Sequence, residues 1–258
     1  MQAKPFIKWV GGKSKLLTNI GTSILEISAK MDTVNYVEPF LGGGSVMWWV
    51  LQNVPNLSRV VVNDCNSDLV LCYEMLKHNS KTLISRLIEL SETFLKLDAE
   101  SRKEFYYKIR RMFNEGCSDN VERAAQFIFL NKTGFNGLFR VNSKGSFNVP
   151  YGRYANPKIL NEYNINECSF LLSKVDVLNR DFYDLLSLAS ANTVFYLDPP
   201  YRPVSYTSSF VGYTAKGFSD LDQIRLSEFC NKIDSLGSYF ILSNSDPQEL
   251  SPEDSFFA

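Results

Sequence analysis

The sequence predicts an α/β fold with a mainly parallel sheet, into which a helical and irregular segment is inserted. Short runs rich in β-branched and aromatic residues recur at 34–38, 59–62 and 193–197, and helical patterns lie between them. Such alternation favours parallel strands joined by crossover helices. The run at 193–197 is free of charge, which indicates burial on both faces of the sheet. From about 80 to 133, helical patterns follow one another without a strand signal, and this break predicts the insertion.

The predicted elements of the amino-terminal half alternate between helix and strand. They are a helix near 14–30, a strand at 34–38, a glycine-rich turn at 39–45, a helix over 46–51, a strand at 59–62 and a helix at about 67–77. Because each strand is followed by a helix, this half contains one βαβα unit.

The second half contains the insertion and the return to the sheet. Its predicted elements are three helical patterns between 80 and 133, an irregular stretch at 131–158 rich in Asn, Gly, Lys and Arg, strands at 173–178, 193–197 and 238–242, and a helix at about 219–235. The irregular stretch is too long for a simple connection between two elements. The insertion therefore consists of the helical patterns together with this stretch.

The distribution of charge predicts a polyanionic partner, although the net charge of the chain is only −1. Before Glu26 the chain has four lysines and no acidic residue, and from Glu162 onward acidic residues outnumber basic ones by 14 to 6. Between Glu122 and Glu162 there is no acidic residue, and the basic ones are Arg123, Lys132, Arg140, Lys144, Arg153 and Lys158. Segregated basic residues on a near-neutral protein are typical of nucleic-acid binding. Chance clustering on a solvated face is the alternative.

The composition argues against metal chemistry, histidine-based catalysis and a membrane span. The single histidine, His78, follows a helical pattern, and the five cysteines are scattered and never form a CxxC pair. A zinc site or a histidine-based triad therefore has almost no side chains available to it. We also expect no signal peptide and no transmembrane segment, because no apolar run is long enough for either.

The glycine-rich turn and the strand after it predict a site for a nucleoside-containing cofactor. Three consecutive glycines, Gly42 to Gly44, let backbone N–H groups approach a ligand at the start of a helix. Asp64 lies at the tip of the next strand, where a carboxylate can accept hydrogen bonds from both hydroxyls of a ribose. A dinucleotide oxidoreductase uses similar geometry, but its GxGxxG spacing is absent. A tight strand-to-helix turn without a ligand is the other explanation.

The turn Asp198-Pro199-Pro200-Tyr201 follows the buried strand at 193–197. Ligands of open α/β sheets bind at the carboxyl ends of the strands, and two prolines form a rigid turn without N–H donors. Such a turn places a carboxylate, a backbone carbonyl and an aromatic ring together. Two acceptors and a stacking surface suit an exocyclic amino group on an aromatic base. An ordinary surface turn is the alternative.

Together these motifs resemble the Dam-type DNA adenine-N6 methyltransferases, in particular the group that modifies GATC. The similarity extends over nearly the whole chain, and the number and order of its motifs make it specific. The motifs are FIKWVGGK at 6–13, EPFLGGG at 38–44, ND at 63–64, NGLFR at 136–140, FNVPYGRY at 147–154, DF at 181–182, DPPY at 198–201 and LSNS at 242–245. The resemblance implies a Rossmann-like methyltransferase core formed by residues 1–78 and 166–258, with a target-recognition subdomain at 79–165.

The resemblance implies S-adenosylmethionine as the cofactor. The residues that it assigns to the cofactor are Trp9, Lys13, Phe40, Gly42, Asp64, Asp181 and Phe182. Trp9 and Lys13 would close over the methionine moiety, with Lys13 pairing with its carboxylate. Asp64 would accept from the ribose hydroxyls, and Asp181 from the amino group of the cofactor's adenine. Asp181 is equally well explained as the N-cap of a helix that follows it.

The same resemblance places catalysis at Asp198, Pro199, Pro200 and Tyr201. The amino nitrogen of adenine is a poor nucleophile because its lone pair is delocalised into the ring. Hydrogen bonds to the Asp198 carboxylate and the Pro199 carbonyl would hold this nitrogen nearer tetrahedral geometry, while Tyr201 stacks on the base. The target atom is inaccessible inside a duplex, so the base must flip out. We expect neither a covalent intermediate nor a metal ion.

DNA contacts are assigned by the resemblance to the amino-terminal segment and to the irregular stretch. The residues are Lys8, Phe135, Asn136, Leu138, Arg140, Pro150 and Tyr154. Arg140 and Lys8 would each contact a guanine, and a bidentate arginine contributes about 1–3 kcal/mol of discrimination. Leu138 and Pro150 offer apolar contact to a thymine methyl group, and Phe135 would wedge into the duplex. Phosphates would be contacted by Lys132, Lys144, Arg153 and Lys158. A plain surface position is the alternative for each of these residues.

The function expected from the resemblance is transfer of a methyl group from S-adenosylmethionine to adenine N6 within GATC in duplex DNA. An amino-methyltransferase for another base and a DNA-binding protein that has lost catalysis are the alternatives. Aspartate rather than serine at Asp198 disfavours cytosine as the target. We expect a monomer or weak dimer on double-stranded DNA, located in the cytoplasm of a bacterial or phage-infected cell.

The chain ends at Phe256-Phe257-Ala258, shortly after the strand predicted at 238–242. Members of the family usually continue with a stretch that completes the sheet with an antiparallel pair. We therefore expect a shortened carboxyl end and an exposed sheet edge. All of the predicted cofactor and catalytic residues precede this point.

Overall fold

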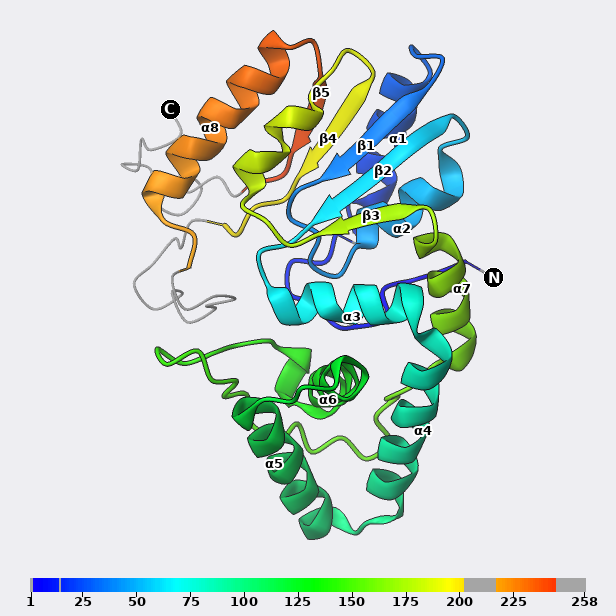
Figure 1. The fold of residues 1–258 in the computed structure, drawn as a ribbon, viewed down its shortest axis with the longest axis vertical. Helices are drawn as coiled ribbons and strands as arrows, with labels where there is room; N and C mark the ends of the chain where they lie inside the picture. The colour runs from blue at the N-terminus through cyan, green and yellow to red at the C-terminus, as the bar shows by residue number, and fades with distance from the viewer. Residues whose placement is uncertain (1, 14, 202–216, 245–258) are drawn as a thin grey trace.

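The computed structural model describes residues 2–13, 15–201 and 217–244 (Figure 1). In this part of the chain a five-stranded sheet has helices on both faces, and a further group of helices lies beyond one end of the sheet. The strands are β1 (Val34–Glu38), β2 (Leu57–Asn63), β3 (Val175–Leu178), β4 (Thr193–Leu197) and β5 (Tyr239–Leu242). The helices near the sheet are α1 (Leu17–Ser28), α2 (Ser45–Asn53), α3 (Ser67–His78), α7 (Glu162–Leu172), α8 (Asp220–Ser235) and the 3₁₀ helix η2 (Phe182–Leu188).

The described strands are all parallel and lie in the order β3-β2-β1-β4-β5. The chain extends outward from β1 through β2 to β3 and then returns to the other side of β1 to form β4 and β5. The carboxyl ends of β1 and β4 therefore flank the point where the strand order reverses, which is the usual ligand site of such sheets. The predicted α/β fold with a mainly parallel sheet is confirmed, and each predicted strand is present.

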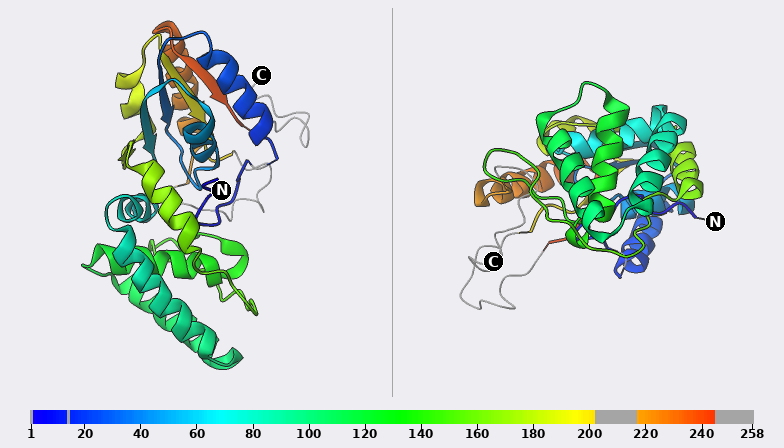
Figure 2. Two further views of the ribbon diagram at one scale, coloured as in Figure 1. Left: turned by 90° about the vertical axis from the view of Figure 1, so that its right-hand side faces the viewer. Right: turned by 90° about the horizontal axis from the view of Figure 1, so that it is seen from below.

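The central strands β1 and β4 are buried on both faces because successive side chains point into two different hydrophobic cores. In β1, Tyr36 packs into the larger core and Val37 into the smaller one. In β4, Tyr196 packs into the larger core and Phe195 into the smaller one. The larger core includes residues of α1, α2 and α3, and the smaller one includes residues of η2 and α8. Figure 2 shows the sheet between these two layers of helices.

The inserted group consists of three helices, as predicted. They are α4 (Ser80–Lys96), α5 (Ala99–Glu115) and α6 (Asn120–Thr133), followed by the short 3₁₀ helix η1 (Phe135–Gly137). Helix α6 contacts α3, α4 and α5, and every residue from 124 to 131 is buried. Its apolar side chains belong to the larger core. Hydrophobic packing is therefore continuous from the sheet to the helical group.

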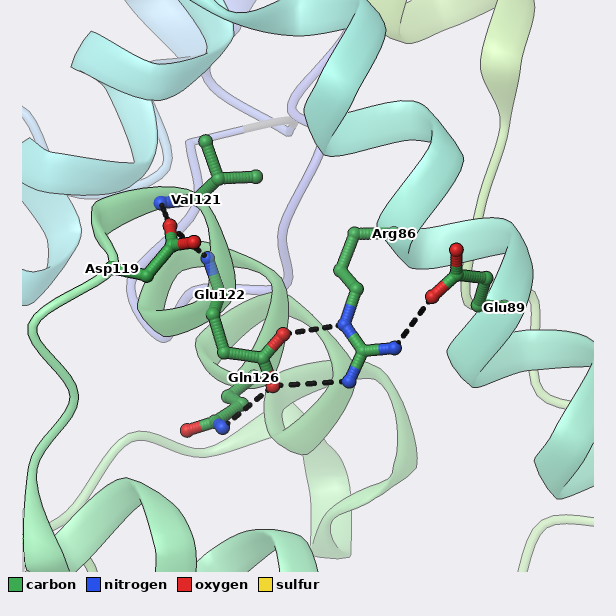
Figure 3. Close-up of polar contacts among 6 residues, drawn as sticks. All are labelled: Arg86, Glu89, Asp119, Val121, Glu122 and Gln126. Carbon is green, nitrogen blue, oxygen red and sulfur yellow. Dashed lines mark hydrogen bonds and ion pairs between the residues drawn. The ribbon is translucent and has the colours of Figure 1, made fainter.

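Charged pairs fasten α6 to the helices around it. Arg123 on α6 binds both carboxylate oxygens of Asp68 on α3, at 2.6 and 3.0 Å. Arg86 on α4 binds both oxygens of Glu122 on α6, and its third nitrogen donates to Glu89 (Figure 3). Because each guanidinium spans two helices, these pairs set the position of α6 relative to both the sheet and the rest of the helical group.

Helix α7 was not predicted. Polar residues are frequent in its sequence, and the side chain of Asn161 caps its amino terminus by accepting from the N–H of Asn164. The helix contacts α3, α4 and β3, so tertiary packing stabilises it more than its own propensity does. The helix expected after Asp181 is the 3₁₀ helix η2, which ends at Leu188. The expectation about the carboxyl end concerns residues 245–258, which lie outside the described residues.

Replacing Arg86 by methionine should destabilise the protein at neutral pH by about 1–2 kcal/mol. The variant loses two charge-assisted hydrogen bonds to Glu122, and partial exposure of both side chains keeps the loss below that of a fully buried pair. Arg86 lowers the pKa of Glu122 from the usual 4.5. Its contribution is therefore present above that pH and is lost as the pH falls through the folded-state pKa.

Urea denaturation of wild type and Arg86→Met at pH 7 and at acidic pH checks this expectation. The difference between the two midpoints should shrink at acidic pH. Glu89→Gln is the control, because Glu89 is the exposed partner of Arg86 and its removal should have little effect. A difference that stays the same at both pH values would contradict the assignment.

Candidate active site at the strand ends

The glycine turn after β1 lies directly against the Trp9 ring. Gly42 and Gly44 have φ of +50° and +68°, a backbone conformation that favours glycine. A Cβ atom on Gly42 would lie 2.7 Å from Cδ1 of Trp9. Position 42 must therefore lack a side chain for the ring to pack on the turn. The structure thus brings Trp9, from the amino-terminal segment, into contact with Gly42 of the turn. Both residues are predicted to bind the cofactor.

Asp64 follows β2 and points toward the same turn. Its Oδ2 accepts from the N–H of Gly42 at 2.9 Å, and its Oδ1 accepts from the N–H of Asn66 at 2.9 Å. Burial raises the pKa of Asp64, and these N–H groups oppose the rise. A carboxylate offers about four acceptor positions. Asp64 is therefore fixed by the backbone while it retains capacity for ligand hydroxyls.

The side chain of Asn63 ties three strand ends together. Its Nδ2 donates to the carbonyls of Pro39, after β1, and of Arg180, after β3, at 3.0 and 3.1 Å. Its Oδ1 accepts from the N–H of Arg180 at 2.8 Å. Asn63 is almost fully buried, so the turns after β1, β2 and β3 are held in one arrangement.

Asp181 caps η2 and also pairs with α8. Its Oδ1 accepts from the N–H of Tyr183 at 2.9 Å and from Nη2 of Arg225 at 2.7 Å. The expectation that Asp181 is a helix cap is confirmed, and its contact with a cofactor stays a prediction. The ring of the next residue, Phe182, is buried and lies 5.3 Å from the ring of Phe40. Two of the three aromatic residues predicted for the cofactor site, Phe40 and Phe182, are therefore in contact.

The proline turn follows β4, the neighbour of β1 at the point where the strand order reverses. Asp198 pairs with Lys13 at 2.8 Å, and the two side chains are 20% and 8% exposed. Burial raises the pKa of Asp198, and the hydrogen bond from Lys13 opposes the rise. Burial lowers the pKa of Lys13, but hydrogen bonds with Asp198 and Tyr201 raise it above its usual value. Lys13 also lies 4.9 Å from the centre of the Tyr201 ring.

Residues from α8 and β5 brace the rest of the proline turn. Gln223 is buried, and its Nε2 donates to the Pro200 carbonyl at 3.2 Å. The Tyr201 hydroxyl lies 3.1 Å from the hydroxyl of Ser243, while the tyrosine as a whole is 42% exposed. The N–H of Ser243 in turn donates to the Leu197 carbonyl at 2.8 Å. The ring of Tyr201 is thus fixed at its hydroxyl and accessible elsewhere.

A buried acid lies beside the two turns. Glu38, the last residue of β1, is 2% exposed and accepts from the Tyr36 hydroxyl at 2.7 Å. Burial raises the pKa of Glu38 to about 8; the Tyr36 hydrogen bond opposes this rise, and the negative charges of Asp198 and Asp64 add to it. At neutral pH the neutral acid is therefore the main form of Glu38.

The residues predicted to contact DNA gather around the recognition loop, which we define as residues 135–140. Phe135 is 49% exposed. Asn136 has φ of +53°, and its N–H donates to the Tyr154 hydroxyl at 3.0 Å. The Nζ of Lys8 lies 4.5 Å from the centre of the Tyr154 ring. Residues from three distant parts of the sequence therefore meet at this loop.

Arg140, Leu138 and Pro150 complete the predicted set. The Nε of Arg140 donates to Oδ1 of Asn148 at 2.7 Å, which orients the guanidinium. Pro150 is exposed, and its carbonyl accepts from the N–H of Phe135 at 2.9 Å. Leu138 is half-buried and packs against the larger core, so only part of its side chain is accessible.

Lys132 differs from the other basic residues that we expected to contact phosphates. It is half-buried, and desolvation, together with the charge of Lys8, lowers its pKa to about 8. Lys144, Arg153 and Lys158 are exposed. Three of the four residues are therefore exposed and Lys132 is half-buried, and the phosphate contacts stay a prediction.

Three residues of this region have no role among the predictions from the sequence: Glu38, Gln223 and Asn131. Each is a polar side chain that is almost fully buried. Residue type alone does not distinguish a buried amide or carboxyl from an exposed one. Two positions in the sequence could have indicated a role. Glu38 is the first residue of the EPFLGGG motif, and Asn131 lies a few residues before the NGLFR motif.

The described residues contain neither a candidate metal cluster nor a candidate membrane span. Within them, no group of three or more His, Cys, Asp or Glu side chains is placed to hold a metal ion. No helix in the same part of the chain is long and apolar enough to cross a membrane. Cavities of about 250 and 220 Å³ lie near the start of β2 and beside η2, and neither is lined by a predicted site residue.

Comparison with protein families identifies the chemistry of this site. The model of the D12 class N6 adenine-specific DNA methyltransferases matches residues 9–256. The chain belongs to this family. The predicted resemblance to Dam-type enzymes is confirmed, and the sheet is the Rossmann-like core of a D12-class methyltransferase. Enzymes of this kind take the methyl group from S-adenosylmethionine and act on DNA.

Individual relatives of this D12-class methyltransferase include restriction-modification enzymes and adenine methylases. The chain is 48% identical over 247 residues to the type II methyltransferase M.MjaIII of Methanocaldococcus jannaschii, covering 95% of this chain and 85% of that protein. It is 39% identical over 247 residues to the type II methyltransferase M1.LlaDCHI of Lactococcus lactis subsp. cremoris, covering 94% and 81%. It is 31% identical over 243 residues to the DNA adenine methylase of Escherichia coli K12, again covering 94% and 81%.

Replacing Glu38 by glutamine should remove a pH dependence of stability. The folded-state pKa of Glu38 is about 8 against an unfolded value of 4.5. The folded state therefore binds the extra proton, and wild type loses stability as the pH rises from 4.5 to about 8. Glutamine can still accept from the Tyr36 hydroxyl but does not ionise.

The measurement is the thermal midpoint of wild type and Glu38→Gln between pH 5 and pH 9. Glu38→Gln should become progressively more stable than wild type up to about pH 8, the folded-state pKa, and the difference should then level off. Because the other titrating groups are common to both proteins, they cancel in the difference. A difference that does not change with pH would show that Glu38 is not held as a neutral acid.

Proposed function

We propose that this D12-class methyltransferase modifies adenine N6 within GATC in duplex DNA and flips the target base out of the helix. Membership of the family establishes adenine-specific DNA methylation. GATC as the site is supported by the resemblance of the recognition loop to the Dam group and by relatives named DNA adenine methylase at 31–33% identity. The main supporting observation is the position of Asp198 and Tyr201 at the point where the strand order reverses, beside Lys13.

The residues at the strand ends fit S-adenosylmethionine. Gly42 lets the Trp9 ring pack directly on the glycine turn, and Asp64 retains acceptor capacity for ribose hydroxyls. We assign the adenine moiety to the pair of Phe40 and Phe182, with Asp181 as acceptor for its amino group. When bound, S-adenosylmethionine supplies a methyl group that is activated by its sulfonium centre. The remaining chemistry is done by side chains and backbone of this chain.

Asp198 and the Pro199 carbonyl act as acceptors for the two hydrogens of the target amino group. Neither proline of the turn has an N–H, so no donor there competes with the amino group. The hydrogen bond from Gln223 to the carbonyl of Pro200 holds the turn in place. Tyr201 stacks on the flipped base, which returns about 1–3 kcal/mol of the lost base stacking. Preorganised acceptors of this kind lower the barrier without rearranging during the reaction.

Lys13 occupies one acceptor position of Asp198, and the remaining positions of this carboxylate are open to the target amino group. In the structure its Nζ lies 2.8 Å from Oδ1 of Asp198, in the position of a hydrogen-bond donor. The same lysine opposes the burial that raises the pKa of Asp198, and so favours the carboxylate form. Since the resemblance also assigns the cofactor carboxylate to Lys13, we propose that the three N–H donors of this lysine serve both acids at once.

The DNA side of the site divides into contacts that specify sequence and contacts that position the protein. Arg140 and Lys8 are proposed to contact the edges of guanine bases. Arg140 donates to Asn148 through its Nε alone, so its other two nitrogens are not used by this bond. Exposed Phe135 is proposed to fill the space left by the flipped base. Exposed basic residues beside the loop, Lys144 among them, are proposed for phosphates.

The target-recognition subdomain is proposed to comprise residues 79–165, with the core formed by 1–78 and 166–258. Helix α7 crosses the second boundary, so the two parts share this helix. We further propose that the enzyme acts on DNA as a monomer or weak dimer. A cytoplasmic location in bacterial or phage-infected cells follows from its DNA substrate.

The test of this function is transfer of labelled methyl from S-adenosylmethionine to two short duplexes. One contains GATC, and the other contains the same site with N6-methyladenine in place of adenine. Label should enter the first duplex alone. Entry of label into both duplexes would support methyltransferase activity but contradict the proposed target atom or site. Absence of label despite duplex binding would favour a protein that has lost catalysis. Asp198→Ala is the control, which should bind duplex without transferring methyl.

Replacing Lys13 by methionine should move the acidic limb of the pH–rate profile to higher pH. Burial raises the pKa of Asp198 and Lys13 opposes the rise, so removal of Lys13 raises this pKa further. The carboxylate form is then lost at a higher pH as the solution is acidified. The measurement is the methyl-transfer rate at saturating S-adenosylmethionine, because the variant is also expected to bind the cofactor more weakly.

Lys13→Arg serves as the matched control, since it retains the positive charge next to Asp198. Its acidic limb should lie closer to that of wild type than the limb of Lys13→Met. If Lys13→Met lowered the rate by the same factor at every pH, the ionisation of Asp198 would not depend on Lys13.

A further inference from the structure

The amino-terminal arm, residues 3–13, contains no strand, and side-chain amides bind its backbone in place of a neighbouring strand. Gln52 of α2 accepts from the N–H of Ala3 and donates to its carbonyl, at 2.8 and 3.1 Å. Asn164 of α7 does the same at Lys4, with both distances 2.9 Å. Each of these amides reproduces the two hydrogen bonds that a neighbouring strand would supply. They hold the start of the arm, which begins beside α7 (Figure 1).

The third clamp, Asn131 of α6, differs because it binds two segments at once. Its Oδ1 accepts from the N–H of Lys8 at 2.8 Å. Its Nδ2 donates to the carbonyl of Lys8 at 2.8 Å and to the carbonyl of Gly137 at 2.9 Å. Asn131 is only 3% exposed, so water does not replace these bonds. One side chain therefore joins the arm to the recognition loop.

Further contacts connect the same two segments. Gly137 has φ of +62°, and a Cβ atom there would lie 2.4 Å from Cδ of Lys8. The Trp9 ring stacks on Phe139 of the loop, with centres 5.9 Å apart, and on its other side lies against Gly42 of the glycine turn. The arm thus contacts the loop that faces DNA and the turn that is assigned to the cofactor.

The far end of the arm reaches the catalytic residue. Lys13 lies five residues beyond Lys8 and pairs with Asp198 at 2.8 Å. These contacts connect the loop to Lys8 through Asn131, to the glycine turn through Trp9, and to Asp198 through Lys13. This is a contiguous physical connection between the surface that contacts bases and the group that holds the target amino nitrogen.

We propose that Asn131 is a positioning residue that makes methyl transfer depend on the bases contacted by the recognition loop. It does so by holding the arm and the loop together, so that a loop misplaced by a wrong base pair also misplaces the arm. This inference rests on the proposed function, in which the loop contacts the target sequence. Asn131 itself touches neither DNA nor cofactor in this scheme.

The isosteric variant Asn131→Asp tests the proposal with little change of volume. One carboxylate oxygen can still accept from the N–H of Lys8. The other carboxylate oxygen replaces the amide nitrogen that donated to the carbonyls of Lys8 and Gly137, so it now faces two carbonyl oxygens without a hydrogen to share. Asn164→Asp is the matched control, because it introduces the same conflict with the carbonyl of Lys4 but does not touch the loop.

The main readout is the ratio of kcat/KM for a GATC duplex to that for duplexes with one base pair changed. In Asn131→Asp this ratio should fall by about tenfold or more, the lower range of what one bidentate base contact contributes. In Asn164→Asp it should stay close to wild type. A purely structural defect lowers the active fraction and scales all duplexes equally, which leaves the ratio unchanged. An unchanged ratio in Asn131→Asp, or an equal fall in both variants, would overturn the proposal.

Gly137→Ala is a second variant that separates the loop from the arm without altering the buried amide. Its added methyl group collides with the Lys8 side chain. It should lower the same ratio while S-adenosylmethionine binding stays near that of wild type. This variant decides the question if Asn131→Asp fails to fold.

Amide hydrogen exchange distinguishes failure of this inference from failure of the proposed target site. On binding duplex DNA, peptides from the arm and from the recognition loop of wild type should gain protection together. In Asn131→Asp the loop peptide should still gain protection, whereas the part of the arm beyond Lys8, which has no proposed DNA contact, should not. This result requires DNA binding but not methylation of GATC. If wild type leaves GATC unmodified, the proposed site is wrong and the exchange experiment still decides whether Asn131 couples the arm to the loop.

Discussion

The ion pair between Lys13 and Asp198 is the interaction on which the site depends. Parallel strands end at one edge of the sheet, so their terminal acids lie close to one another. Glu38, Asp64 and Asp198 all lie in surroundings that raise their pKa values, and the charges of Asp198 and Asp64 raise that of Glu38 further. Two devices relieve this crowding: Glu38 holds a proton, and Lys13 places a positive charge 2.8 Å from Asp198. The cation from the arm therefore favours the carboxylate form of Asp198, which is the acceptor proposed for the target amino group.

The arm that supplies this cation is positioned by side chains and not by secondary structure. Backbone groups withdrawn from water need partners, and three amides provide them, from Gln52, Asn164 and Asn131. These amides belong to α2, α7 and α6, so the arm is held by helices of the core and by a helix of the inserted group. The position of Lys13 consequently depends on how the two groups of helices pack together. The continuous hydrophobic core across α3 and α6 makes that packing well defined.

Most of the fold followed from local patterns, and the failures have physical causes. The strands were recognisable because burial on both faces demands continuous apolar runs, and the helices because their apolar residues recur on one face. Helix α7 was missed since its polar sequence favours no helix by itself and its stability comes from the Asn161 cap and from packing. Lys132 was grouped with exposed lysines because sequence gives no measure of burial. For Asp181 the two explanations could not be separated by sequence, and the hydrogen bond to Tyr183 confirms the cap without testing the cofactor contact.

The sequence by itself determined the fold class, the family and the residue types at the active site. These depend on hydrophobic periodicity and on short motifs such as the glycine turn and the proline turn, whose meaning is local. Only the tertiary structure decided which of these residues meet: Lys13 with Asp198, and Asn131 with both Lys8 and Gly137. Contacts between residues more than a hundred positions apart arise from the order in which the strands assemble and from the packing of α6. Because burial and hydrogen bonding at such contacts depend on the whole fold, no segment of the sequence specifies them alone.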